Sequence, residues 1–165
     1  MAITRTGAAA EHWENARKLF SGVGGVEEDK AKALVEYSEV IKLLPNDAES
    51  YERRAYCYSD QEQFEKAIAD MDKAISIEPK NGDFYCTRGY FNLKNGEMEK
   101  AKPDYEKGLA LLPKKEASDK CFTIGMTIKQ VTGNKREAAV FYQKCVELGG
   151  EYADAAKRKL AELGV

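Results

Sequence analysis

The amino-acid sequence predicts an all-α fold in which antiparallel helix pairs repeat along the chain. Pro45, Pro79 and Pro113 follow one another at a period of 34 residues. Other columns keep the same period, with Ala at 33, 67 and 101, Tyr or Met at 37, 71 and 105, and Ile or Leu at 41, 75 and 109. Apolar or small residues also stand at 64, 67, 68, 71, 74 and 75, the spacing of a helix with one buried face. Matched columns at one fixed period indicate a repeat architecture.

The first repeat, residues 8–45, is expected to be irregular. Its first helix is predicted from about residue 9 to residue 20, and an insertion at residues 21–29 precedes its second helix. The insertion holds three glycines, but no Gly-Lys-Ser/Thr motif follows it and no hydrophobic strand precedes it. The insertion is therefore interpreted as a longer turn and not as a phosphate-binding loop.

Two regular repeats are expected at residues 46–79 and 80–113, and a degenerate repeat at residues 114–149. Pro103 lies inside the second helix of the third repeat, where a proline predicts a kink or a delayed start. Residues 150–165 are predicted to form an amphipathic capping helix, because the last repeat of an array otherwise exposes an apolar face. Docking of this helix on another subunit is the alternative. All these elements are assigned to a single domain, residues 1–165.

The pattern resembles the tetratricopeptide repeat (TPR), a helix–turn–helix unit of 34 residues. The residues that carry the resemblance in the best copy are Tyr51, Ala55, Tyr58, Ala67, Ala74 and Pro79. Those of the next copy are Tyr85, Gly89, Ala101, Tyr105 and Pro113. The resemblance covers nearly the whole chain. It implies an α-α superhelix, a right-handed solenoid of antiparallel helix pairs, and it implies a scaffold rather than a particular activity.

Small residues are expected where the two helices of a pair meet. Ala55 or Gly89 on the first helix should face Ala67 or Ala101 on the second, which lets the two backbones approach closely. Gly108 replaces the alanine of the regular repeat and predicts a close approach of a neighbouring helix at that point.

Composition narrows the function classes. Lys and Arg total 26 and Asp and Glu total 28, so the chain lacks the basic excess of a nucleic-acid-binding protein. No window approaches 18 consecutive apolar residues, and the first 20 residues lack the apolar core of a secretory signal. Four well-separated cysteines suit reduced thiols better than a disulfide framework. We therefore expect a cytoplasmic protein with neither nucleic-acid nor membrane partners.

Catalytic and metal-binding motifs are missing from the sequence. His12 is the single histidine, so the sequence predicts neither a histidine-based metal site nor a Cys–His pair. No nucleophile elbow, zinc-protease helix or dinucleotide fingerprint occurs. We expect no catalytic residues, no metal and no cofactor, and the chain is predicted not to be an enzyme.

The superhelix that the resemblance implies has a concave face, lined mainly by the first helix of each pair. By periodicity, the candidate partner-binding residues on that face are Trp13, Arg17, Glu52, Tyr56, Tyr90, Lys94, Phe122, Met126 and Lys129. Tyr56 and Tyr90 hold matching positions, so one aromatic ring should project per repeat. Aromatic and Met side chains beside charges are typical of peptide-binding anchors. The alternative is that these rings pack against the neighbouring repeat.

Related co-chaperones bind a C-terminal carboxylate with a clamp of Lys, Asn and Arg. The positions here that match the clamp hold Glu52, Tyr56, Thr87, Asp119 and Thr123, or, one repeat earlier, Arg17, Arg53, Asp83 and Thr87. Acidic residues repel a carboxylate, so the clamp is expected to be absent. The acids at 49, 52, 83 and 119 instead favour a partner of basic character.

The predicted function is that of an adaptor, which binds a peptide segment or a helix of another protein in the concave groove. The chain itself is expected to be a monomer or a weak homo-oligomer. The alternative is a structural subunit that self-associates or docks into a larger complex through its terminal helices.

Overall fold

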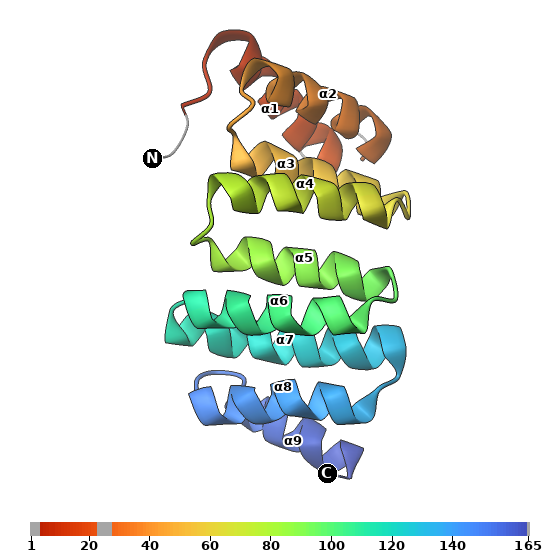
Figure 1. Cartoon of the computed structure of the whole chain (residues 1–165), viewed down its shortest axis with the longest axis vertical. Helices are drawn as coiled ribbons and strands as arrows, with labels where there is room; N and C mark the ends of the chain where they lie inside the picture. The colour runs from red at the N-terminus through yellow and green to blue at the C-terminus, as the bar shows by residue number, and fades with distance from the viewer. Residues whose placement is uncertain (1–3, 23–27, 165) are drawn as a thin grey trace. The chain divides into compact units, whose positions relative to one another are not determined.

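A computed structural model describes residues 4–22 and 28–164 (Figure 1). Within these ranges all regular secondary structure is α-helical, in nine helices. The helices pack as antiparallel pairs, so the predicted all-α class is confirmed. The chain divides into two compact units, Met1–Lys80 and Asn81–Val165, which are described separately. The grouping of the helices into four repeats and a cap stays a prediction.

The first unit contains two helix pairs. Its helices are α1 (Gly7–Ser21), α2 (Lys30–Leu43), α3 (Ala48–Asp60) and α4 (Phe64–Ile77). α1 packs on α2 and α3 packs on α4, while α2 also contacts α3. Around these contacts lies a buried cluster, Ala16, Ala33, Tyr37 and Cys57, with Trp13, Leu19, Phe20 and Leu34 packed against it.

The predicted insertion at 21–29 begins one residue too early, because Ser21 is the last residue of α1, whereas Gly22, Glu28 and Asp29 lie between α1 and α2. Residues 23–27 lie outside the described ranges. Asp29, the last residue of the insertion, caps α2 because its carboxylate accepts a hydrogen bond from the Lys32 backbone N–H at 2.9 Å. The helix boundary that the sequence placed after the insertion is therefore explained by a side-chain cap.

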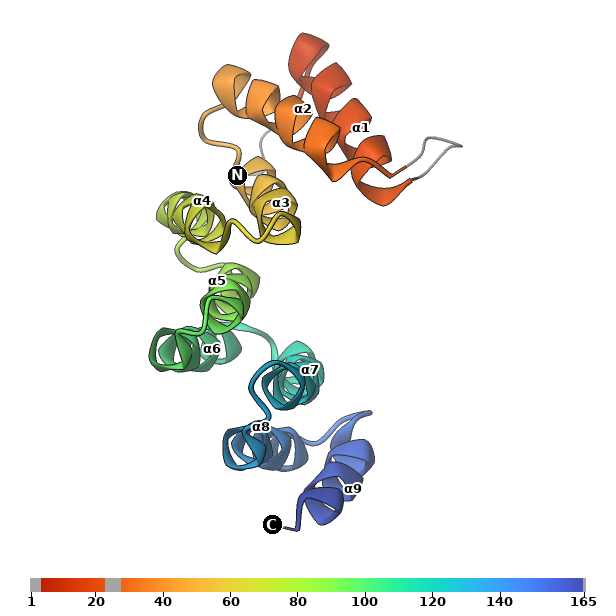
Figure 2. The same cartoon turned by 90° about the vertical axis from the view of Figure 1, so that its right-hand side faces the viewer.

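The second unit contains two helix pairs and a last helix. They are α5 (Gly82–Lys94), α6 (Met98–Leu111), α7 (Lys114–Thr132), α8 (Lys135–Leu148) and α9 (Ala153–Leu163). Figure 2 looks almost along α5 and α6, which lie side by side. The last helix, α9, packs on α8. Ala156 and Leu163 of α9 are buried in the core of this unit.

Pro103 does not delay the helix that contains it. α6 begins at Met98 and ends at Leu111, and both positions correspond to the ends of α4 one period earlier. Pro103 lies in the second turn of α6 and is exposed, so its ring meets solvent rather than a packed neighbour. Of the two outcomes that the sequence predicted, the late start is therefore excluded.

Glycines mark the closest approaches between helices of the second unit. A Cβ atom on Gly89 would lie 2.9 Å from the Tyr105 ring and 3.1 Å from the carbonyl oxygen of Ala101. A Cβ atom on Gly125 would likewise lie 2.8 Å from the Tyr142 ring of the next helix pair. The predicted contact of Gly89 with the helix that carries Ala101 is confirmed. The predicted close approach at Gly108 is also confirmed, because a Cβ atom there would lie 2.6 Å from the Gly82 carbonyl oxygen.

Candidate functional site

The candidate residues on α1 are held by neighbours within the first unit. The Trp13 ring meets Tyr37 edge-on, with 5.4 Å between centroids. The Arg5 guanidinium lies over the Trp13 ring, 3.5 Å from its centroid. Arg17 is exposed and donates a hydrogen bond to Glu14 at 2.9 Å. Trp13 is therefore covered by a cation of the same chain.

The candidate residues on α3 are half-buried. The Tyr56 ring meets Phe20 of α1 edge-on, with 6.5 Å between centroids. Glu52 lies one turn before Tyr56 on the same helix. Edge-to-face contacts of this kind stabilise aromatic packing. Tyr56 thus combines a packing contact on one edge with a partly exposed ring.

The candidate residues of the second unit lie on α5 and α7. Tyr90 is half-buried, with its ring 5.4 Å from that of Phe91, and Lys94 is exposed at the end of α5. Phe122 stacks on Tyr152, which precedes α9, at 5.1 Å and 18° between the ring planes. Met126 is 45% exposed and Lys129 is half-buried. Phe122 therefore packs against the chain itself, whereas Met126 offers an apolar side chain to solvent.

Three large side chains hold one position in successive first helices. Tyr56 follows Ala55, Tyr90 follows Gly89 and Met126 follows Gly125. Each small residue is buried, and the following residue is rotated by about 100° around a helix of 3.6 residues per turn. The large side chain therefore lies on the flank of the contact and keeps part of its surface exposed. We call Tyr56, Tyr90 and Met126 the flank side chains.

Two of the acids expected to attract a basic partner already hold cations of this chain. Glu49 accepts hydrogen bonds from Arg5 at 2.8 Å and from Arg53 at 3.5 Å. Asp83 of α5 forms an ion pair with Lys120 of α7 at 2.6 Å. The negative charge that the sequence predicts on the first helices is thus partly compensated inside each unit.

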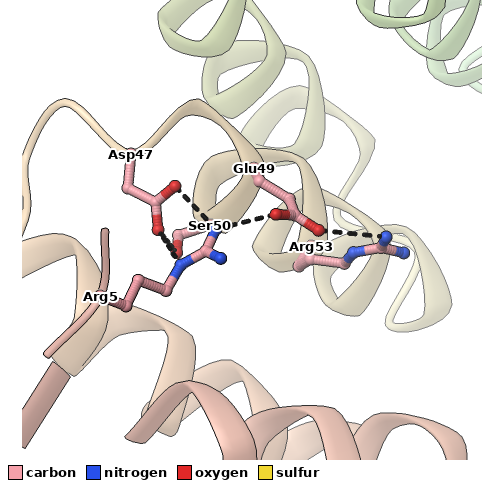
Figure 3. A network of polar contacts seen from close by, with 5 residues as sticks. All are labelled: Arg5, Asp47, Glu49, Ser50 and Arg53. Carbon is pink, nitrogen blue, oxygen red and sulfur yellow. Dashed lines mark hydrogen bonds and ion pairs between the residues drawn. The ribbon is translucent and has the colours of Figure 1, made fainter. Parts of the chain in front are cut away.

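Figure 3 shows the polar network in which Glu49 takes part. Arg5 Nε and Nη2 donate to the two carboxylate oxygens of Asp47 at 2.7 and 2.8 Å, and the Ser50 hydroxyl donates to Asp47 at 2.6 Å. Burial by itself lowers the pKa of Arg5, but hydrogen bonds and charge from Asp47 and Glu49 outweigh it, so its pKa lies above the ordinary value. Arg5 and Asp47 were not among the predicted site residues.

A second polar feature, also not predicted, links the two helices of a pair. Arg54 and Asp70 form a two-pronged ion pair at 2.7 and 2.8 Å, and Arg88 and Asp104 form the same pair at 2.6 and 2.9 Å. Arg54 and Arg88 are 34 residues apart, and so are Asp70 and Asp104. This repetition is the sequence signal from which the two ion pairs could have been predicted. Between α1 and α2, the His12 Nδ1 and Glu36 Oε2 atoms lie 2.7 Å apart.

The thiols and carboxylates form no reactive or metal-binding group in the described parts of the chain. Burial raises the pKa of the Cys57, Cys86 and Cys121 thiols to about 12, and it also raises that of Cys145. All four cysteines are free and protonated at neutral pH. No cluster of three or more His, Cys, Asp or Glu side chains that could hold a metal ion is found among residues 4–22 and 28–164.

In the same residues no helix combines the length and apolarity needed to cross a bilayer.

Comparisons with known proteins agree with this geometry. Two family models, both described as tetratricopeptide repeat, match residues 48–81 and 71–102. A comparison with curated proteins finds no matching sequence.

Solved structures similar to this chain include several of MamA. One crystal structure of MamA has a TM-score of 0.66 and 20% identity, covering 85% of this chain and 77% of its own. A second has a TM-score of 0.66 and 19% identity, covering 93% and 75%. MamA from Desulfovibrio magneticus RS-1, from residue 41 to its end, has a TM-score of 0.66 and 17% identity, covering 85% and 75%. At these identities the likeness shows the fold alone.

Proposed function

The chain is a tetratricopeptide-repeat protein, and on this premise we propose that it is a non-enzymatic adaptor that binds a peptide segment or a helix of another protein. Tetratricopeptide repeats mediate protein–protein interactions, which is the general function. The observation that supports the particular proposal is the set of flank side chains. Partly exposed aromatic and Met side chains on rigid helices suit the anchor pockets of a protein interface.

The proposed binding surface is the first-helix surface of each unit. In the first unit it contains Tyr56 and Glu52 of α3. In the second unit it contains Tyr90 and Lys94 of α5 with Met126 and Lys129 of α7. Binding is not by a carboxylate clamp. Free, buried cysteines also suit the reducing cytoplasm, which is the proposed location.

Replacing the two tyrosines tests this surface. The double variant Tyr56→Ala with Tyr90→Ala is expected to retain at least about tenfold less of the co-purifying proteins than the unmodified chain, since the loss of one aromatic anchor worth about 1.4 kcal/mol already lowers the affinity tenfold. The measurement is affinity capture followed by quantitative mass spectrometry. A matched control, Val35→Ala with Val140→Ala, removes exposed apolar side chains from the second helices α2 and α8 and should retain the full set.

A folded tyrosine double variant that keeps its full set of captured proteins would contradict the proposed surface. Circular dichroism of the same samples shows whether the helices are intact. If the valine control loses the captured proteins and the tyrosine variant keeps them, the binding surface lies on the second helices.

The second candidate is a structural subunit that self-associates or docks into a complex through its terminal helices. It is favoured by exposed apolar side chains on α2 of the first helix pair, where Val35 is 57% and Leu43 50% exposed. Light scattering across a concentration series distinguishes the two. A mass that stays at one chain supports the adaptor, and a mass that rises to a defined oligomer supports the subunit.

A further inference from the structure

The Arg5 side chain is bound within the first unit much as a ligand would be. Its guanidinium contacts three different groups: both carboxylate oxygens of Asp47, one carboxylate oxygen of Glu49, and the ring of Trp13. Figure 3 shows Arg5 reaching these carboxylates from a segment outside the helices. A planar fork between two carboxylates and over an aromatic ring is the arrangement that distinguishes arginine from lysine.

The groups around Arg5 are positioned by the fold and not by Arg5 alone. Asp47 is the N-cap residue of α3 and its side chain is 5% exposed, with one oxygen held by the Ser50 hydroxyl. Glu49 lies in the first turn of α3 and is held by Arg53 one turn later. Trp13 is fixed by its edge-on contact with Tyr37. Without Arg5 these groups would remain as a pre-organised site with one uncompensated negative charge.

Arg5 makes the side-chain hydrogen bonds between residues 4–6 and this site. These residues lie before α1, and Thr4 and Thr6 are exposed. Thr6 makes no side-chain cap at the start of α1. Gly7 then takes a φ of 55°, in the left-handed region that glycine adopts without strain. Movement of one guanidinium would therefore break all these hydrogen bonds together.

We propose that Trp13, Asp47 and Glu49 form an arginine-binding site, which Arg5 occupies within the chain and an arginine of a partner peptide occupies when Arg5 leaves. The claim that a partner peptide supplies this arginine rests on the proposed adaptor function, whereas the claim that the site binds arginine does not. Arg5 competes as a tethered ligand, so it lowers the apparent affinity for a partner by the fraction of time that it fills the site.

The chain has one tryptophan, so the fluorescence of Trp13 reports occupancy of this site directly. The probe is N-acetylarginine amide, with N-acetyllysine amide as the comparison. The Arg5→Ala variant is expected to show a saturable change in Trp13 emission with the arginine probe, at an apparent affinity at least about tenfold above that of the unmodified chain. The lysine probe should bind at least about tenfold more weakly, because it lacks the planar fork.

The matched control is Lys32→Ala. It removes one positive charge from the same unit, but at a lysine that pairs with Asp29 outside the site. This variant should titrate like the unmodified chain. Adding Asp47→Asn to Arg5→Ala should abolish binding of the probe. If Arg5→Ala loses helical circular dichroism, Arg5→Lys replaces it, since it keeps the charge but not the two-pronged bond.

Each outcome bears on the proposal. A folded Arg5→Ala chain without saturable probe binding overturns the site, as does equal binding of the two probes or an equal gain in Lys32→Ala. A concentration-dependent dimer that forms only with Arg5 present assigns the arginine to a second copy and overturns the partner peptide. None of these results changes the tyrosine capture experiment, so the two proposals fail separately.

Discussion

Replacing Arg88 with Met is expected to lower the free energy of unfolding of the second unit by about 3 kcal/mol. The Asp104 side chain is 10% exposed and is held by both prongs of Arg88 and by the Asn92 amide at 3.1 Å. Met keeps most of the apolar stem, so the main loss is the cation. A buried carboxylate without its cation carries an uncompensated desolvation cost of about 3–5 kcal/mol, and the partial exposure of Arg88 places the effect at the lower end. Urea denaturation measures the change.

The chain supplies its own control for this prediction. Gly125 of α7 and Tyr142 of α8 correspond to Gly89 of α5 and Tyr105 of α6. Ile124 and Phe141 therefore stand where α5 and α6 have Arg88 and Asp104. The double variant Arg88→Ile with Asp104→Phe copies this natural apolar pair and should recover most of the lost stability. An Arg88→Met variant within about 0.5 kcal/mol of the unmodified chain would show that Asp104 is solvated or otherwise compensated.

Replacing Gly108 with Val is the second large effect, expected to cost about 3 kcal/mol or more. A Cβ at this position would lie 2.5 Å from Cys86 Sγ and 2.6 Å from the Gly82 carbonyl oxygen. The second contact is backbone, so it cannot be relieved by a rotamer change and α5 must move away from α6. Overpacking of this kind costs about 1–3 kcal/mol and occasionally more.

Glu106→Val is the matched variant for this substitution, because residue 106 is exposed on the same helix and receives the same side chain. It should change the free energy of unfolding by less than about 0.7 kcal/mol, the difference in helix propensity. Thermal denaturation of both variants gives the comparison. Equal midpoints for Gly108→Val and Glu106→Val would contradict the close approach of α5 and α6.

Periodicity was sufficient to predict the helix pairs and the small residues between them. Gly89 and Gly108 were identified because a missing side chain at a repeated position has a direct packing consequence. The paired columns of Arg88 and Asp104 were equally visible, but charge on a helix is ordinarily solvated. Which charges are buried depends on how the two helices face each other, and that requires the structure.

The arginine site could not be predicted in the same way. Arg5 and Asp47 are 42 residues apart, and Arg5 has no counterpart one period later. Their contact depends on the path of the chain before α1, for which no repeated column gives evidence. Likewise, the sequence placed Trp13 and Phe122 among the binding residues, whereas only the structure shows Arg5 and Tyr152 lying against them.

Selection from a random peptide library displayed on phage tests the central claim, protein binding by the first helices, most directly. The full chain and its Tyr56→Ala, Tyr90→Ala variant are used as parallel targets. The account predicts that the full chain enriches a convergent set of peptides with apolar and basic residues, and that the variant retains them at least about tenfold more weakly. Equal retention by both targets would contradict it, and so would enrichment of peptides that depend on a free acidic C-terminus.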